Sequence, residues 1–228
     1  MTEAVAVAAA APLIEFDRVC KGFGPARPVL RDVSFTIGRG QLVVLTGANG
    51  AGKSTVLQMI AGWLAPDEGR VMVAGAEPSR LRGAALTALR QSIGIVPQDL
   101  HLLADRSVLD NVMLPALAAG LWRKAATERA RAALGRVDLS DGEVMPAQLS
   151  AGAQRRAALA RAIINRPVML LADEPTAHLD AAAAAKVLQL LHEFAQAGVA
   201  VVLASQGEPA PLPATARRLQ LAEGQLTQ

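Results

Sequence analysis

An α/β fold built on a mostly parallel sheet, with an antiparallel β subdomain and an inserted helical subdomain, is predicted by the order of apolar segments along this chain. Short β-rich runs alternate with helix-like segments, which is typical of parallel sheets buried on both faces. The 228 residues are 52% hydrophobic and 19% charged, enough for the core of one ordinary domain. We therefore expect a single domain over 13–228. An Ala-rich leader, 1–12, precedes it, and its composition is compatible with either an ordered or a disordered segment.

The first strands and the helices follow from local patterns. Residues 13–19 alternate apolar and polar, and 29–37 repeat the pattern after a Gly/Pro-rich turn, so the two segments predict an antiparallel edge sheet. Continuous apolar runs predict buried strands at 41–46, 168–172 and 199–204. Three helices are expected: one over 53–62, one over 122–137, and one between the apolar runs 168–172 and 199–204. In 122–137, basic residues interleave with Glu128. The pattern change near Gln98 predicts a helical subdomain of about 99–166, and Glu223-Gly224 predicts a final hairpin.

Composition and residue counts exclude several classes of protein. The net charge of +3 comes from 23 Lys and Arg against 20 Asp and Glu, which gives no indication of a nucleic-acid partner. One cysteine, Cys20, excludes an internal disulfide, and three scattered histidines do not predict a zinc site. The opening apolar stretch is interrupted by Pro12 and lacks a basic start, so we expect neither a membrane span nor a signal peptide. A cytoplasmic protein is expected.

A phosphate-binding loop is the strongest chemical signal in the sequence. The segment 47–54 matches G-x-x-x-x-G-K-[ST], directly after an apolar strand and at the start of a helix. Small residues let successive backbone N–H groups surround phosphates, and the helix N-terminus adds its positive end. Lys53 is expected to contact the β- and γ-phosphates, and the Ser54 hydroxyl to bind Mg²⁺. The nucleotide-binding residues expected here are Gly47, Ala48, Asn49, Gly50, Ala51, Gly52, Lys53, Ser54 and Thr55.

Two carboxylates follow a second apolar strand. Asp173 comes directly after the run 168–172, and Glu174 is next in the chain. A carboxylate at the tip of a buried strand can reach Mg²⁺ through water, and its neighbour can orient or polarise an attacking water. An acidic pair at a strand end is weak evidence alone, since turns favour Asp. Together with the phosphate loop it becomes strong evidence for a nucleotide site in which Glu174 is the candidate catalytic residue.

A family resemblance rests on the segment 149–154 (LSAGAQ), which resembles the LSGGQ signature of ABC-type ATPases. The chain is similar to that family from Leu13 to its end: Phe23 stands where an aromatic ring stacks on adenine, Gln98 lies in the loop after a strand, and 177–180 (AHLD) resembles the D-loop. The resemblance implies the P-loop NTPase fold of ABC ATPases, with ATP and Mg²⁺ as cofactors. Ser54, Gln98 and Asp173 are the implied metal ligands.

The resemblance also implies a head-to-tail homodimer, in which each of two ATP molecules lies between the phosphate loop of one subunit and the signature of the other. Ser150 and Gly152 precede a helical segment, so their N–H groups and hydroxyl are expected to face an anion held by the partner. Gln154 and Asp180 join the nucleotide-binding set by resemblance alone. An ordinary N-cap at Ser150 is the structural alternative.

Within the family, the stretch 101–115 is most similar to the cell-division branch, through the pairs Asp105-Arg106 and Asp110-Asn111. Lipoprotein-release and macrolide-export ATPases share much of this stretch and remain alternatives. The resemblance implies an integral membrane subunit as partner, docked near the Gln98 loop and the helical subdomain. The protein is then expected at the inner face of the cell membrane.

Two departures from the family pattern matter. Gln206 stands where the family has a switch histidine, and no other histidine lies at a matching position, so no local replacement is predicted. Gln206 can donate a neutral hydrogen bond but carries no charge. Ala151 replaces a signature glycine, which costs on the order of 1 kcal/mol if the site requires φ above zero. The hypothesis is ATP binding and dimerisation with slow hydrolysis; its alternative is a fully active site.

Three other functions fit parts of the sequence. A nucleotide-dependent scaffold with little catalysis agrees with Gln206. A soluble ABC ATPase of DNA repair or ribosome function is disfavoured, because tandem cassettes or a long coiled coil do not fit in 228 residues. A small-molecule kinase agrees with the phosphate loop but leaves the signature unexplained.

Overall fold

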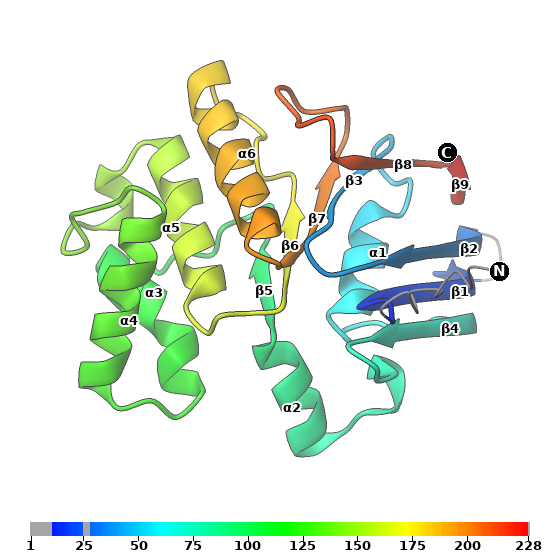
Figure 1. Cartoon of the computed structure of the whole chain (residues 1–228), viewed down its shortest axis with the longest axis horizontal. Helices are drawn as coiled ribbons and strands as arrows, with labels where there is room; N and C mark the ends of the chain where they lie inside the picture. The colour runs from blue at the N-terminus through cyan, green and yellow to red at the C-terminus, as the bar shows by residue number, and fades with distance from the viewer. Residues whose placement is uncertain (1–10, 25–27, 228) are drawn as a thin grey trace, which may run out of the picture.

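The computed structural model describes residues 11–24 and 28–227, so most of the predicted leader, 1–12, lies outside the described residues. Its centre is a six-stranded sheet in the order β5-β6-β7-β3-β8-β9 (Figure 1). The first five of these strands run parallel and β9 is antiparallel. Their bounds are β3 Leu42–Thr46, β5 Ile93–Val96, β6 Met169–Asp173, β7 Ala200–Ser205, β8 Arg217–Ala222 and β9 Gln225–Thr227. The predicted parallel sheet and final hairpin are confirmed.

A second sheet is antiparallel throughout, in the order β2-β1-β4. Its strands are β1 (Ile14–Gly22), β2 (Pro28–Ile37) and β4 (Glu68–Val73). The predicted antiparallel β subdomain and the pairing of its first two strands are confirmed, and this sheet is separate from the main one. The third strand was not predicted, because it opens with Glu68-Gly69-Arg70 and its apolar residues come only at the end.

Two apolar clusters cover the two faces of the main sheet. Along β3, Val43 and Leu45 face a cluster that includes helix α1 (Lys53–Ile60) and the antiparallel sheet. Leu42 and Val44 face the other cluster, which includes α5 (Ala151–Ile163) and α6 (Ala181–Gln196). Because successive side chains of a strand point to opposite faces, each central strand contributes to both clusters. Helix α1 therefore lies between the two sheets (Figure 1).

The segment between β5 and β6 is helical. Helices α3 (Val108–Ala118), α4 (Arg123–Arg136) and α5 pack together beside the main sheet (Figure 1). Helix α2 (Gly83–Gln91) precedes β5, and short 3₁₀ turns occupy Pro78–Arg80 and Pro146–Gln148. Among the described residues, none of these helices combines the length and apolar character that crossing a bilayer requires.

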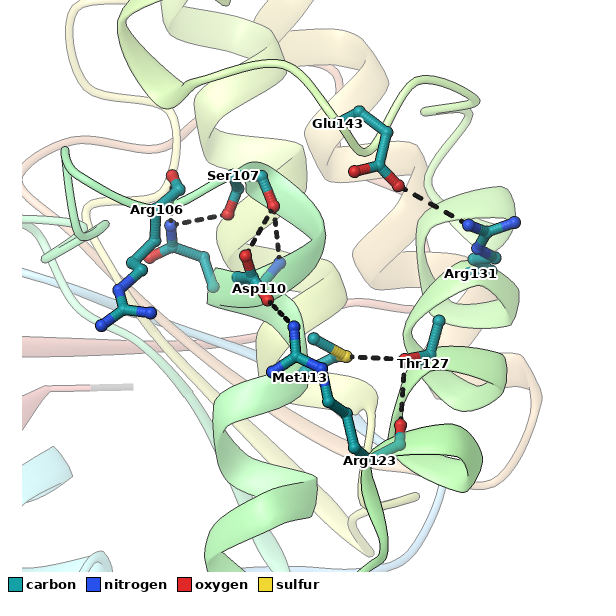
Figure 2. A network of polar contacts seen from close by, with 9 residues as sticks. Arg106, Ser107, Asp110, Met113, Arg123, Thr127, Arg131 and Glu143 are labelled. Atoms are coloured by element: carbon teal, nitrogen blue, oxygen red, sulfur yellow. Dashed lines mark hydrogen bonds and ion pairs between the residues drawn. The ribbon is translucent and has the colours of Figure 1, made fainter.

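Polar contacts join α3 to α4, as Figure 2 shows. Ser107 caps α3, because its Oγ accepts from the Asp110 backbone N–H at 3.1 Å. The Asp110 carboxylate pairs with Arg123 at the start of α4, 3.1 Å away. Thr127 Oγ1 donates to the Arg123 carbonyl at 2.9 Å and lies 3.1 Å from the sulfur of Met113. Of these contacts, the Asp110–Arg123 ion pair and the Thr127–Met113 contact connect the two helices.

Asn111 anchors the loop that leads into α3. Its side chain is fully buried, its Oδ1 accepts from the Leu103 N–H at 2.6 Å, and its Nδ2 donates to the carbonyls of Leu103, Arg106 and Ser107. A buried amide needs such partners, since an unpaired one costs about 1–3 kcal/mol. The loop after Gln98 is thereby tied to the helical subdomain.

Candidate functional site

A cavity of about 600 Å³ opens at the carboxyl ends of the parallel strands. Sites in α/β sheets lie at this edge because the loops after parallel strands meet there. The described lining consists of Phe23, Val29, Asn49, Gly50, Gly52, Lys53, Ser54, Thr55, Gln98, Asp173, Glu174, Ala177, His178 and Gln206. Most residues proposed from the sequence for nucleotide and metal binding therefore share one cavity.

The phosphate loop occupies 47–52, between β3 and α1. Gly52 ends it with φ 105°, and a Cβ there would lie 2.7 Å from Leu30 Cδ2, so only glycine fits. The Lys53 ammonium is buried and donates to the carbonyls of Gly47 and Ala48 at 2.8 and 3.2 Å. Gly47, Ala48 and Ala51 shape the loop without lining the cavity. The loop therefore presents Lys53 and the N-terminus of α1 to one wall of the cavity.

The two carboxylates stand opposite this loop. Asp173 is the last residue of β6, and Glu174 follows with φ 46° and donates its N–H to the Ala204 carbonyl at 2.9 Å. Glu174 Oε1 lies 3.9 Å from Lys53 Nζ, and its Oε2 lies 3.5 Å from Ser205 Oγ. A backbone held in the left-handed region by its surroundings is common at functional sites. Glu174 is thus fixed where it can accept a proton from a water in the cavity.

The chemistry of the lining fits Mg²⁺. The Ser54 hydroxyl in α1, the Gln98 amide in the loop after β5 and the Asp173 carboxylate at the end of β6 all offer oxygen ligands. Mg²⁺ prefers oxygen ligands and uses few carboxylates together with substrate phosphates. Among the described residues, no group of three or more His, Cys, Asp or Glu is placed to hold a metal.

Arg155, which was not singled out from the sequence, links two loops that border the cavity. Its guanidinium is buried and donates to the carbonyls of Gln98 at 3.0 Å and Ala177 at 3.4 Å. Burial lowers the pKa of this guanidinium, and the charge of Asp99 opposes that shift. Arg155 belongs to α5, so the helical subdomain holds both the loop after β5 and the loop after β6.

Three lining residues were missed from the sequence: Val29, Ala177 and His178. From the sequence, no histidine stands at a position that matches the switch histidine; in the structure, His178 lines the same cavity as Gln206. His178 belongs to the segment compared with the D-loop, which was the available signal. Phe23 also lines the cavity and is 55% exposed, as a side chain that stacks on a planar ligand must be.

The signature residues lie outside this cavity, at the start of α5. Ser150 is exposed and caps the helix, accepting from the Ala153 N–H at 3.3 Å. Gln154 Nε2 donates to the carbonyls of Pro146 and Leu149, so it holds the preceding turn. Ala151 is the first helical residue and its φ is not positive. The condition under which alanine would be strained at this position is therefore not met, since Ala151 begins the helix capped by Ser150.

Gly152 and Asp180 shape the contact between α5 and α6. A Cβ on Gly152 would lie 2.8 Å from the Cβ of Ala183, closer than such atoms approach. Asp180 caps α6, its Oδ1 accepting from the Ala183 N–H at 2.8 Å. The two helix N-termini therefore approach each other closely beside the exposed end of α5.

Comparisons with known proteins agree with this geometry. The family model described as "ABC transporter" matches residues 30–177. The cell division ATP-binding protein FtsE of Escherichia coli (strain K12) is 40% identical over 215 residues, covering 94% of this chain and 97% of that protein. The lipoprotein-releasing system ATP-binding protein LolD of Cereibacter sphaeroides is 41% identical over 201 residues, covering 85% and 89%. The dimeric ATP-binding cassette MJ0796, solved in a post-hydrolysis state with ADP and Pi, superposes with a TM-score of 0.84 at 30% identity, covering 94% and 97%.

The role of Arg155 can be measured through stability. Arg155→Met keeps a long apolar stem but leaves the Gln98 and Ala177 carbonyls without their donor, so the free energy of unfolding should fall by about 1–3 kcal/mol in urea titrations. Arg129→Met, at an exposed position of α4, is the matched control and should change it by less than about 0.5 kcal/mol. Equal stabilities of the two variants would contradict the role given to Arg155.

Proposed function

Since this chain belongs to the ABC transporter family as an ATP-binding subunit, a family that hydrolyses ATP, we propose that it binds Mg-ATP in the cavity at the carboxyl edge of the main sheet. We further propose that it couples hydrolysis to movement of an integral membrane subunit like FtsX, in cell division. The cavity that brings the phosphate loop, Asp173 and Glu174 together is the observation that carries the proposal.

The lining residues have distinct roles in this proposal. The backbone of the phosphate loop and the N-terminus of α1 bind the phosphates, Lys53 neutralises charge on the β- and γ-phosphates, and Phe23 stacks on the base. Mg²⁺, held by Ser54, Gln98 and Asp173, would neutralise charge on the phosphate oxygens. In hydrolysis a water oxygen bonds to the γ-phosphorus while the bond to the β–γ bridging oxygen breaks. Glu174 accepts the water proton, and ADP keeps the bridging oxygen.

The exposed start of α5 supports a head-to-tail homodimer. Ser150 and the first turn of α5 present backbone N–H groups and a hydroxyl at the surface, outside the cavity of their own subunit. Such a helix N-terminus favours an anion, and in our proposal that anion is the γ-phosphate bound to the partner subunit. The similar cassette MJ0796 is described as dimeric.

Ser150→Asp tests this dimer without disturbing the helix. Asp is as good an N-cap as Ser, so the melting temperature should stay unchanged. Its negative charge would face the partner's γ-phosphate, and the ATP-dependent dimer of a Glu174→Gln background should be lost in analytical ultracentrifugation. Ser150→Thr is the control and should keep the dimer. Full dimerisation of Ser150→Asp would rule out a γ-phosphate contact at Ser150.

A groove of about 380 Å³ supports docking of the membrane subunit near the helical subdomain. Elements α2, β5, α3 and α5 contribute to it, through residues that include Arg90, Ile95, Pro115 and Arg161. Docked there, the protein would be peripheral on the inner face of the cell membrane. The similarity to LolD over 85% of this chain keeps a lipoprotein-release or macrolide-export role as the second candidate. Identifying the membrane subunit that copurifies with the full chain would distinguish the cell-division role from the lipoprotein-release or macrolide-export role.

Slow turnover is the last part of the proposal, and Gln206 is its basis. Gln206 follows β7 and lines the cavity, where a neutral amide stabilises a developing negative charge less than a charged donor does. If hydrolysis were slow enough to be negligible, the protein would act as a nucleotide-dependent scaffold.

Gln206→His should therefore raise the steady-state ATPase rate of the purified protein with its membrane subunit about tenfold. The KM for ATP should change little, because the phosphate loop is untouched. Glu174→Gln in the same assay is the control for contaminating activity. A turnover of the natural protein that equals that of Gln206→His would show that Gln206 does not limit hydrolysis.

A further inference from the structure

His178 occupies a place in the cavity that the proposed chemistry does not yet use. It lies in the turn between β6 and α6, four positions after Glu174, and lines the same cavity as Lys53, Glu174 and Gln206. The other two histidines do not line this cavity: His101 lies in the loop before α3 and His192 lies within α6.

The backbone of this turn is fixed on both sides of His178. The Ala177 carbonyl accepts from buried Arg155, the Ala177 N–H donates to the Glu174 carbonyl at 3.2 Å, and Asp180 caps α6. His178 itself has φ 62°. The left-handed region is unusual for a residue other than glycine and persists where neighbouring contacts determine it. The position of His178 at the cavity is thus set by the fold.

The balance of charged side chains in the cavity suggests a role for a histidine at position 178. Lys53 and His178 are the described lining residues that can carry a positive charge, against the carboxylates of Asp173 and Glu174. Lys53 already faces the Glu174 carboxylate and two loop carbonyls. A triphosphate brings several negative charges, and more develops on the transferred phosphoryl oxygens during hydrolysis. The amide of Gln206 and an imidazole can both donate a hydrogen bond, but only an imidazole can also hold a positive charge near neutral pH.

We propose that His178 contacts the terminal phosphate of the ATP bound in its own subunit and stabilises the transferring phosphoryl group. The proton of the attacking water still passes to Glu174, while a ring N–H of His178 donates a hydrogen bond to a phosphoryl oxygen. His178 then supplies much of the hydrolysis that remains with glutamine at position 206. This inference rests on the proposed function, because it needs ATP in the cavity.

The test is a double-mutant cycle between His178→Asn and Gln206→His in the full chain, measured as single-turnover ATP hydrolysis. Asn tolerates positive φ, so His178→Asn keeps the turn; His178→Gly, which also tolerates it, is a second variant. His101 has φ 48°, so His101→Asn is the matched control. Thermal melting shows that each variant is folded.

His178→Asn should lower the rate of hydrolysis about tenfold with less than about a threefold change in ATP affinity. In the Gln206→His background the same substitution should cost no more than about twofold, because the two histidines would serve one phosphoryl group. Equal losses in both backgrounds, or a loss matched by His101→Asn, would overturn the role of His178. An unchanged rate in His178→Asn would overturn it as well, while the proposed function stands; a natural chain that binds no ATP would overturn the proposed function itself.

Discussion

The parallel register of β3, β7 and β6 is the constraint on which the rest of the site depends. Thr46 at the end of β3 pairs with Ser205, and Asp173 at the end of β6 pairs with Ala204. Because these strands end level with one another, the phosphate loop, Gln206 and Glu174 begin at the same edge of the sheet. If β3 or β6 slipped by one residue against β7, each side chain of the slipped strand would turn to the other face of the sheet. Lys53 and Glu174 would then be separated.

Contacts from α5 connect this edge to the helical subdomain. Arg155 holds the Gln98 loop and the turn at Ala177 through one buried guanidinium, and Gly152 allows α5 to approach Ala183 of α6. Packed and hydrogen-bonded elements transmit displacement, because their interiors are dense. A rotation of α5 would therefore displace both loops that border the cavity, as the proposed coupling to a membrane subunit requires.

Sequence patterns were sufficient to assign a site residue wherever that residue lies in the segment that follows an apolar strand. Lys53 and Glu174 could be assigned to one site because each belongs to a segment that follows an apolar strand. The order of apolar runs predicted strands β3, β6 and β7 and the helices α1 and α6 that follow two of them. Strand β4 was missed because its first three residues, Glu68-Gly69-Arg70, are not typical of a strand and leave only three apolar residues as a signal. His178 was missed because its place depends on a turn with positive φ, held by Arg155, and no residue pattern reports a contact of that kind.

Binding of ATP to the purified full chain tests the central claim most directly. Calorimetric titration with ATP in the presence of Mg²⁺ should show saturable binding at one site per chain. Lys53→Ala should weaken the affinity about tenfold or more, since it removes the cation that faces the phosphates. If the natural chain shows no saturable binding of adenine nucleotide, or if Lys53→Ala binds as tightly, the cavity is not the nucleotide site and the account is wrong.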